Sequence, residues 1–184
     1  CEGLPGGFGP VYRVLKQMEE SGRVRRGFFV EGLSGAQFAL AGAVERLRGA
    51  RADEPPVDGW TARDVRVLAA SDPANPYGAL LPWPETGAGS RPKRAGGAWT
   101  LLVAGLPVLY LSANHLLSFP RTIEAQEGVL DLALDALARI PRVGRGRLLI
   151  RRIDGVPATE SGLRERLLRH GFEADYDALA RLIP

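Results

Sequence analysis

The 184-residue chain contains 23 Gly and 14 Pro, a fifth of its length, against roughly 12% in average proteins. Its apolar share of 45% excludes a disordered chain, and no apolar run approaches the ~20 residues that span a bilayer. One cysteine excludes a disulfide scaffold and favours a reducing, cytoplasmic compartment. The chain opens at Cys1 without a signal segment, so we expect a piece of a longer protein.

The net charge of +3 is distributed unevenly along the chain. Residues 1–51 carry a net +3, residues 52–138 a net −4, residues 139–169 a net +6 and the last fifteen residues a net −2. All but two of the 24 basic residues are Arg. Clustered arginines suit a phosphate backbone. The alternative is that a high Arg content reflects base composition, with these groups simply solvated.

Helical spacing of apolar residues begins near the amino terminus. Gly9 and Pro10 are typical of a helix start and Gly22 of a helix end. Between them, the spacing i, i+3, i+4 and i+7 is occupied by Val11, Val14, Leu15 and Met18. We therefore expect an amphipathic helix in this segment.

Two β-like runs follow this helix, Val24–Val30 and Gln37–Leu40, and the Gly-containing segment between them predicts a hairpin. A short helix over Ala43–Arg48 closes the unit. A helix followed directly by a hairpin is typical of the C-terminal half of a winged helix. We predict a winged-helix unit over residues 1–52, followed by a linker at Asp53–Pro56.

Cations and aromatic rings gather at the predicted helix-to-hairpin junction. In winged-helix modules the helix before the wing enters a groove while the wing contacts the backbone. The cations expected to contact phosphates are Arg13, Lys16, Arg23, Arg25 and Arg26, and the nearby rings are Tyr12, Phe28 and Phe29. A ring stacked on an unpaired base is the functional interpretation. The alternatives are a ring that fills the core and a module that docks on protein.

Residues 57–184 predict an α+β unit that resembles a small antiparallel β-barrel with two packing helices. The expected strands are Val65–Ala70, Ala98–Val103, Leu106–Ser112, Leu116–Phe119 and Leu148–Ile153. The expected helices run from Ile123 to Ile140 and from a Ser161 cap to Gly171. Residues 84–97 lack periodicity and are predicted to form a mobile surface loop.

The sequence lacks the motifs of several chemistries. Neither Lys16 nor Lys93 follows the Gly-rich turn of a P-loop, so we predict no ATP hydrolysis by this piece. His115 and His170 lie far apart, Cys1 has no partner, and Gly-x-Ser-x-Gly is missing. We therefore predict neither a metal site nor a cofactor in this piece. His170 precedes a helix-ending Gly, where the helix dipole favours a cation, and we expect it to be structural.

Residues 72–84, which read DPANPYG and then LPWP, form an unusually rigid stretch. Its prolines fix φ, and its Asp and Asn side chains cap local turns. An ordered loop lined by aromatic rings is either a ligand site or a structural clamp over one end of a barrel. We expect the clamp.

Three long strings stand out beyond these short motifs. They are GGFGPVYRVLKQMEESGRVRRGFFVEGLSGAQFALAGAVERLR, DPANPYGALLPWP and RPKRAGGAWTLLVAGLPVLYL. In this order and spacing they resemble the extreme C-terminal region of bacterial large helicase-related (Lhr) proteins, superfamily 2 DNA helicases implicated in DNA repair. The resemblance is close over residues 2–120 and continues more loosely to Gly171-Phe172.

The resemblance implies a parent protein whose two RecA-like motor domains use ATP and Mg²⁺ to translocate on single-stranded DNA. The missing P-loop agrees with a motor outside this piece. The family's C-terminal extension consists of winged-helix modules and a β-barrel-like module, is similar to winged-helix DNA glycosylases, and has been linked to oligomer formation. The implied partners are DNA, single-stranded or as a tailed duplex, the helicase core of the same chain and further copies of it, with no membrane.

The end of the chain departs from the family pattern. The family closes with a Thr-Pro-Arg-Gly turn and a basic strand, whereas residues 173–179 here are acidic. A glycosylase carboxylate near the terminus, which activates water or stabilises an oxocarbenium ion, would have Asp175 or Asp177 as candidates. The alternative, which we expect, is an exposed acidic tail.

Together these observations predict a DNA-binding and assembly module of an Lhr-type repair helicase, associated with the nucleoid and not catalytic by itself. One alternative is part of a winged-helix DNA glycosylase unit that removes a damaged base. Another is a purely structural oligomerisation module, motivated by the apolar face of the helix at 123–140 and by the barrel strands.

Overall fold

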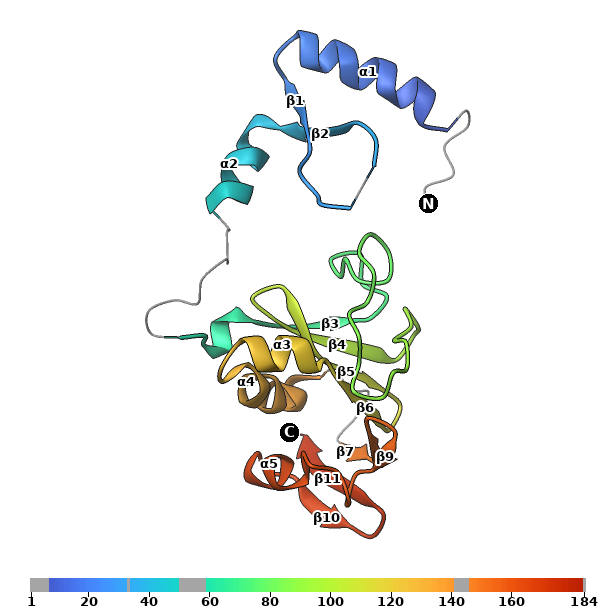
Figure 1. The fold of residues 1–184 in the computed structure, drawn as a ribbon, viewed down its shortest axis with the longest axis vertical. Helices are drawn as coiled ribbons and strands as arrows, with labels where there is room; N and C mark the ends of the chain where they lie inside the picture. Colours follow the sequence, from blue (N-terminus) through green and yellow to red (C-terminus); the bar gives the residue numbers. More distant parts are fainter. Residues whose placement is uncertain (1–6, 33, 50–58, 141–145, 184) are drawn as a thin grey trace. The chain divides into compact units, whose positions relative to one another are not determined.

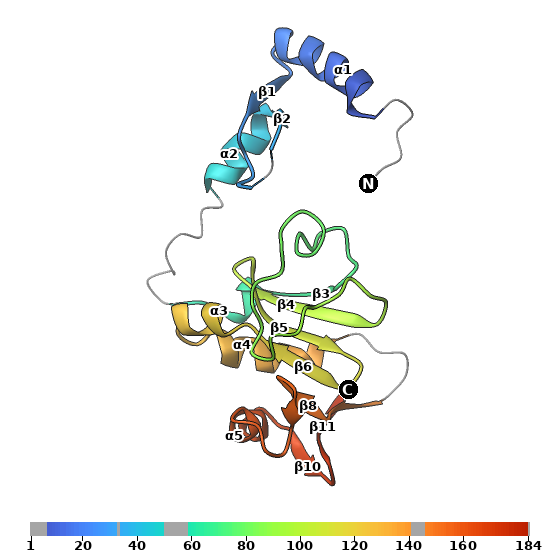
Figure 2. The same ribbon diagram turned by 45° about the vertical axis from the view of Figure 1, so that its right-hand side comes forward.

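The computed structural model describes residues 7–32, 34–49, 59–140 and 146–183. The chain divides into two compact units, Cys1–Glu54 and Pro55–Pro184, and each is described by itself (Figure 1 and Figure 2). We call them unit 1 and unit 2. The predicted linker at Asp53–Pro56 lies outside the described residues. No helix within the described ranges is long and apolar enough to cross a membrane.

Unit 1 consists of a helix, a two-stranded hairpin and a second helix (Figure 1). In chain order these are α1 (Phe8–Glu20), β1 (Val24–Gly27), β2 (Gln37–Leu40) and α2 (Ala41–Gly49). α1 ends before Gly22, whose φ of 72° is the left-handed conformation that glycine adopts without strain. The predicted helix, hairpin and short helix are therefore confirmed.

The first strand is shorter than the sequence predicts, because it ends at Gly27 rather than Val30. The side chain of Gln37 accounts for the difference. Its Oε1 accepts hydrogen bonds from the backbone N–H groups of Phe29 and Val30, both at 2.8 Å, and its Nε2 donates to the Val30 carbonyl at 3.1 Å. A side chain thus satisfies backbone groups that a continued strand pair would otherwise satisfy.

Unit 2 is built around a six-stranded sheet in the order β3-β4-β5-β6-β8-β9. Its strands are β3 (Val65–Ala69), β4 (Ala98–Val103), β5 (Leu106–Ser112), β6 (His115–Ser118), β8 (Arg152–Ile153) and β9 (Val156–Pro157). All neighbours pair antiparallel except β6 and β8, which are parallel. The three consecutive strands predicted between residues 98 and 119 are confirmed. They follow from apolar runs separated by two-residue turns.

A second sheet of three strands lies beside a short helix in unit 2 (Figure 2). Its strands are β7 (Gly146–Ile150), β10 (Glu173–Asp175) and β11 (Ala178–Ile183), in the order β10-β11-β7, and α5 (Arg164–Arg169) packs against β11. The strand predicted at residues 148–153 is divided, since β7 and β8 belong to different sheets. The described strands form open sheets and no closed barrel, so unit 2 is a mixed α/β unit with antiparallel sheets.

The single helix predicted from Ile123 to Ile140 is wrong. The structure has α3 (Pro120–Ala125), α4 (Val129–Ala136) and a 3₁₀ turn, η2 (Leu137–Arg139). Gly128 separates the two α-helices because it takes a left-handed φ of 77°, and Pro120 begins α3 at a position where its missing N–H costs little.

The core of unit 2 is centred on α4. Five of its eight residues are buried, so it is apolar nearly all round, as expected of a helix surrounded by other elements. α4 contacts β3, β4 and β5, and η2 contacts β11, so both sheets share one hydrophobic core. The apolar face that motivated the oligomerisation hypothesis is therefore buried inside unit 2 and is not available to a second copy.

The rigid stretch at residues 72–84 packs on the six-stranded sheet as a clamp. The Trp83 ring stacks on Tyr77 and on Phe119, with ring centres 5.8 and 6.2 Å apart. Asn75 is 1% exposed, and its Nδ2 donates to the Ala70 carbonyl at 3.1 Å. Every one of these contacts is internal to unit 2, which is the pattern of a structural clamp rather than an open ligand site.

Residues 84–97 contain no helix or strand, as predicted, and two of them, Lys93 and Arg94, are held by side-chain hydrogen bonds. The Arg94 guanidinium donates to the backbone carbonyls of Ser71, Asp72, Asn75 and Tyr77 at 2.6–3.2 Å. The Tyr110 hydroxyl binds the Lys93 backbone on both sides, accepting from its N–H at 3.3 Å and donating to its carbonyl at 2.9 Å. Side chains therefore hold the C-terminal part of a segment that has no regular backbone pairing.

Candidate nucleic-acid interface

The two cations predicted on the first helix lie on its exposed side. Arg13 and Lys16 are exposed, whereas Val11 and Leu15 on the opposite side are half-buried. Residues three apart are neighbours on a helix surface, so Arg13 and Lys16 form one small basic stripe. Arg23 is also exposed and lies in the turn between α1 and β1.

Arg25 and Arg26 point to opposite faces of the hairpin, because successive side chains of a strand alternate. Arg26 faces α1 and contacts Glu19 at 3.6 Å, whereas Arg25 contacts Glu45 of α2 at 3.8 Å. Both arginine side chains are more than half exposed, and such ion pairs contribute only about 0–1 kcal/mol. The structure thus divides the five predicted cations among several faces, and leaves both hairpin arginines only weakly engaged.

Phe28 is the most exposed ring of unit 1, with 91% of its surface accessible. It follows β1 directly, and the backbone beyond it is fixed by the Gln37 amide through Phe29 and Val30. The Phe29 ring lies over Gly27, where an added Cβ would approach it to 3.1 Å. The fold therefore holds the backbone on both sides of Phe28 and leaves its ring in solvent.

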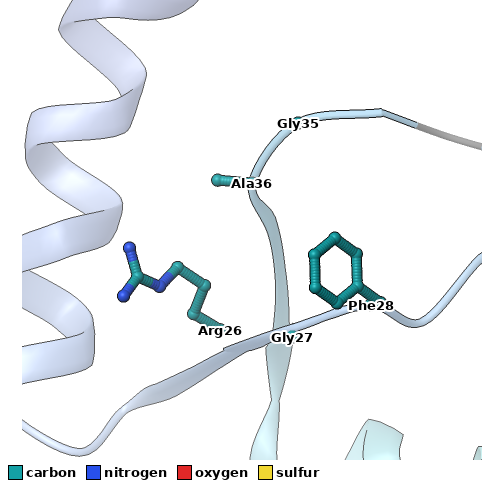
Figure 3. A pocket seen from close by; sticks show the side chains of 5 residues that line it. All are labelled: Arg26, Gly27, Phe28, Gly35 and Ala36. Carbon is teal, nitrogen blue, oxygen red and sulfur yellow. The ribbon is translucent and has the colours of Figure 1, made fainter.

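Two hollows flank the Phe28 ring. The first is lined by Arg26, Gly27, Phe28, Gly35 and Ala36 (Figure 3). In Figure 3 the Arg26 side chain extends toward the helix, and the Phe28 ring extends away from it. The second hollow is lined by Phe28, Phe29, Val44, Leu47 and Arg48. The exposed Phe28 ring thus borders two hollows, one lined by Arg26 and the other by Arg48. This arrangement suits a nucleotide, whose base can stack on the ring while its phosphate contacts a guanidinium.

The other two predicted rings are engaged in packing. Tyr12 contacts Phe8 and Phe38, with ring centres 6.0 and 5.9 Å apart. Phe29 is half-buried over Gly27. The sequence alone places three rings together at this junction, and the structure selects Phe28 among them. Arg48 is a basic residue at this site that the sequence reasoning missed, although its position in the last turn of a short predicted helix was visible.

Asp175 and Asp177 belong to a hairpin rather than to a free tail, and their side chains are 41% and 53% exposed. They flank the turn that joins β10 to β11 in the three-stranded sheet. Asp175 pairs with Arg147 at 3.0 Å, and Asp177 accepts a hydrogen bond from Arg151 at 2.6 Å. Arg147 belongs to β7 and Asp175 to β10, so their pair joins the two outer strands of the sheet. Arg151 directly follows β7, and its pair with Asp177 reaches the turn between β10 and β11.

His170 ends α5, as the sequence predicts, but it also bridges two carboxylates of α4. Its Nδ1 lies 2.7 Å from Asp135 and its Nε2 lies 3.0 Å from Asp131. Both aspartates are one helical turn apart, so they face the ring together. This contact joins α5 to α4 and gives His170 a structural position. Among the described residues, no three His, Cys, Asp or Glu side chains come together as a metal site.

Unit 1 consists of a helix, a β-hairpin and a second helix, the order of elements found in a winged-helix domain, and a mixed α/β unit follows it in the chain. Residues 1–58 match the winged-helix domain of large helicase-related proteins. The chain thus belongs to the Lhr family, of which it is a C-terminal region.

Two relatives match most of the chain. The Lhr helicase/probable uracil glycosylase of Mycolicibacterium smegmatis is 44% identical over 160 residues, covering 85% of this chain and 10% of the relative. The Lhr helicase/uracil glycosylase of Escherichia coli is 34% identical over 182 residues, covering 97% of this chain and 11% of the relative. The chain therefore spans about a tenth of the length of these relatives.

Proposed function

We propose that unit 1 is a DNA-binding module of an Lhr helicase, and that it binds single-stranded DNA through the β1–β2 hairpin. The observation that carries this proposal is the exposed Phe28 ring, held by the Gln37 amide between two hollows that each contain an arginine. The ring stacks on an unpaired base, and Arg25, Arg26 and Arg48 neutralise phosphates. Arg13, Lys16 and Arg23 extend the basic surface around the turn.

Such an interface contacts phosphates and stacks on the face of any base, so it binds single strands with little sequence preference. Because its cations displace counterions from the phosphates, its affinity depends strongly on salt. In a longer Lhr chain, this module follows a motor that uses ATP and Mg²⁺. The module keeps the displaced strand bound while the helicase acts in DNA repair at the nucleoid. Its partners are then DNA and the helicase core of the same chain.

The test is fluorescence anisotropy of a labelled oligothymidylate against the chain at several salt concentrations. Replacing Arg25 and Arg26 by Ala is expected to weaken binding and to lower the salt slope by about 1.4, since each single-strand phosphate contact contributes about 0.7. The matched control replaces both by Lys, which keeps the two charges and is expected to keep the slope. An unchanged slope in the Ala variant removes these residues from the interface.

A second proposed function is a contribution to uracil removal, which is favoured by the names of both relatives. In that reaction water cleaves the N-glycosidic bond, releasing uracil and leaving an abasic sugar. Asp175 and Asp177 are the carboxylates proposed to stabilise the developing positive charge, and their ion pairs with Arg147 and Arg151 hold them in place.

Incubating uracil-containing DNA with the chain, and with a longer C-terminal region that includes it, tests this second function. We expect uracil release that is lost in a variant with Asp175→Asn and Asp177→Asn. Release that continues unchanged in that variant excludes both carboxylates, and no release from the longer protein excludes the activity.

A further inference from the structure

A shallow groove of about 320 Å³ lies on unit 2, between the segment at residues 90–95 and the turn that joins β5 to β6. Its basic lining consists of Arg91 and Lys93, with the His115 ring beside them, and no carboxylate lines it. Its apolar lining includes Leu117 and the buried ring of Tyr110. The groove therefore combines positive charge with an apolar surface, well away in sequence from the hairpin of unit 1.

The two cations of this groove have no anionic partner among the described residues. Arg91 and Lys93 are exposed, and none of the ion pairs of the described ranges includes them. Other arginines of unit 2 are engaged: Arg121 with Glu85, Arg147 with Asp175, Arg151 with Asp177 and Arg164 with Glu165. The groove thus holds two basic side chains, Arg91 and Lys93, that no carboxylate neutralises.

The backbone that carries these cations is fixed by the fold. Arg94 is bound to four carbonyls of the 71–77 segment, and the Tyr110 hydroxyl holds the Lys93 backbone from both sides. Pro92 is buried between the two exposed cations. The sequence Arg-Pro-Lys-Arg thereby alternates between groups that anchor the segment and groups that face the groove. A binding site whose backbone is ordered before the ligand arrives loses less entropy on binding.

We propose that this groove is a second DNA site, which binds the phosphodiester backbone of a single strand. Arg91 and Lys93 contact phosphates, and the apolar lining receives the sugar or base of an unpaired nucleotide. A duplex suits this lining less well, because its base faces are already stacked within the helix. The inference rests on the proposed function only in taking DNA as the ligand, since its residues belong to the other unit.

The test uses the whole chain with Arg91→Ala and Lys93→Ala combined, and measures oligothymidylate affinity between 50 and 200 mM salt. Loss of two single-strand phosphate contacts lowers the salt slope by about 1.4, so the fourfold rise in salt weakens the variant about sevenfold less than the unmodified chain. The matched control combines Arg121→Ala with Arg164→Ala, which removes two cations already paired with carboxylates. We expect the control to keep the slope, and thermal unfolding to show that both variants are folded.

The proposal is overturned by an unchanged slope in the groove variant, or by an equal fall in the control. It is also overturned by a fall that affects duplex binding while single-strand binding is unchanged. Inorganic phosphate is expected to compete no better than chloride at equal ionic strength, and strong competition by phosphate would identify a site for small anions instead. The Arg25→Ala, Arg26→Ala variant is measured in parallel. If the salt slope falls only in this hairpin variant, the hairpin proposal stands and the groove proposal does not. If it falls only in the groove variant, the groove proposal stands and the hairpin proposal does not.

Discussion

Replacing Phe28 by Ala separates stacking from charge at the hairpin. The ring is 91% exposed and makes no contact that holds the hairpin together, because the Gln37 amide binds the backbone beyond it. Exposed substitutions of this kind change the free energy of unfolding by less than about 0.5 kcal/mol. The folded state of the variant is therefore expected to be intact.

The expected loss of affinity follows from base stacking. An aromatic side chain contributes about 1–3 kcal/mol per stacked base, which corresponds to a roughly five- to 150-fold rise in the Kd for single-stranded DNA. The salt slope is expected to stay the same, because a phenyl ring neutralises no phosphate and releases no counterion. This combination of weaker binding and an unchanged slope distinguishes a stacking ring from a cation.

The assay is fluorescence anisotropy with oligothymidylate across a salt series, accompanied by thermal unfolding. Phe28→Leu is the matched control, because it keeps an exposed apolar side chain and removes only the ring; we expect it to bind nearly as weakly as Phe28→Ala. If the Ala variant binds oligothymidylate as tightly as the unmodified chain, the ring does not stack. If the Leu variant binds normally, the contact is simply hydrophobic.

Three further predictions concern the fold of unit 2. Leu134→Ala removes a fully buried side chain from α4 and is expected to cost about 2–5 kcal/mol in chemical denaturation, with a loss below 1 kcal/mol contradicting the described core. Gly78→Ala places a Cβ 2.3 Å from Trp83 Nε1 at a φ of +75°, so we expect a loss of at least about 1–3 kcal/mol and a changed tryptophan fluorescence. Burial raises the pKa of Tyr77 above its ordinary value near 10, so its contribution is fully present below pH ~10 and declines as the pH rises toward the folded-state pKa. Tyr77→Phe, measured by denaturation across that range, is expected to reduce this alkaline decline, and an identical pH dependence in both proteins would contradict it.

The elements that the sequence predicts correctly are those with local signals. α1 has a Pro near its start and a Gly after its end, and β4, β5 and β6 are apolar runs separated by two-residue turns. The division of the predicted 123–140 helix depends on Gly128 taking a left-handed φ, whereas a glycine within a helical pattern is often tolerated. The two sheets of unit 2 depend on long-range pairing, such as β7 with β11, which no local pattern encodes.

The site was predictable in composition but not in geometry. The five cations and three rings of the hairpin region are evident from the sequence, yet the opposite directions of Arg25 and Arg26 require the register of the strand. The selection of Phe28 depends on Gln37, nine residues further along the chain, and on the close approach of the Phe29 ring to Gly27. The groove on unit 2 was missed because Arg91 and Lys93 lie in a segment without periodicity, and the anchoring by Arg94 and Tyr110 is purely tertiary.

The hydrogen bonds from Arg94 to four backbone carbonyls also affect what happens to unit 2 when a protease cuts the chain. Residues 85–91 include several exposed positions, where a protease has access to the backbone. On the amino-terminal side of such a cut, Asn75 and Trp83 stay packed against the sheet, and on the other side Arg94 stays bound to the 71–77 carbonyls. A single nick in this segment therefore leaves unit 2 assembled, so that it separates into two pieces only under denaturing conditions.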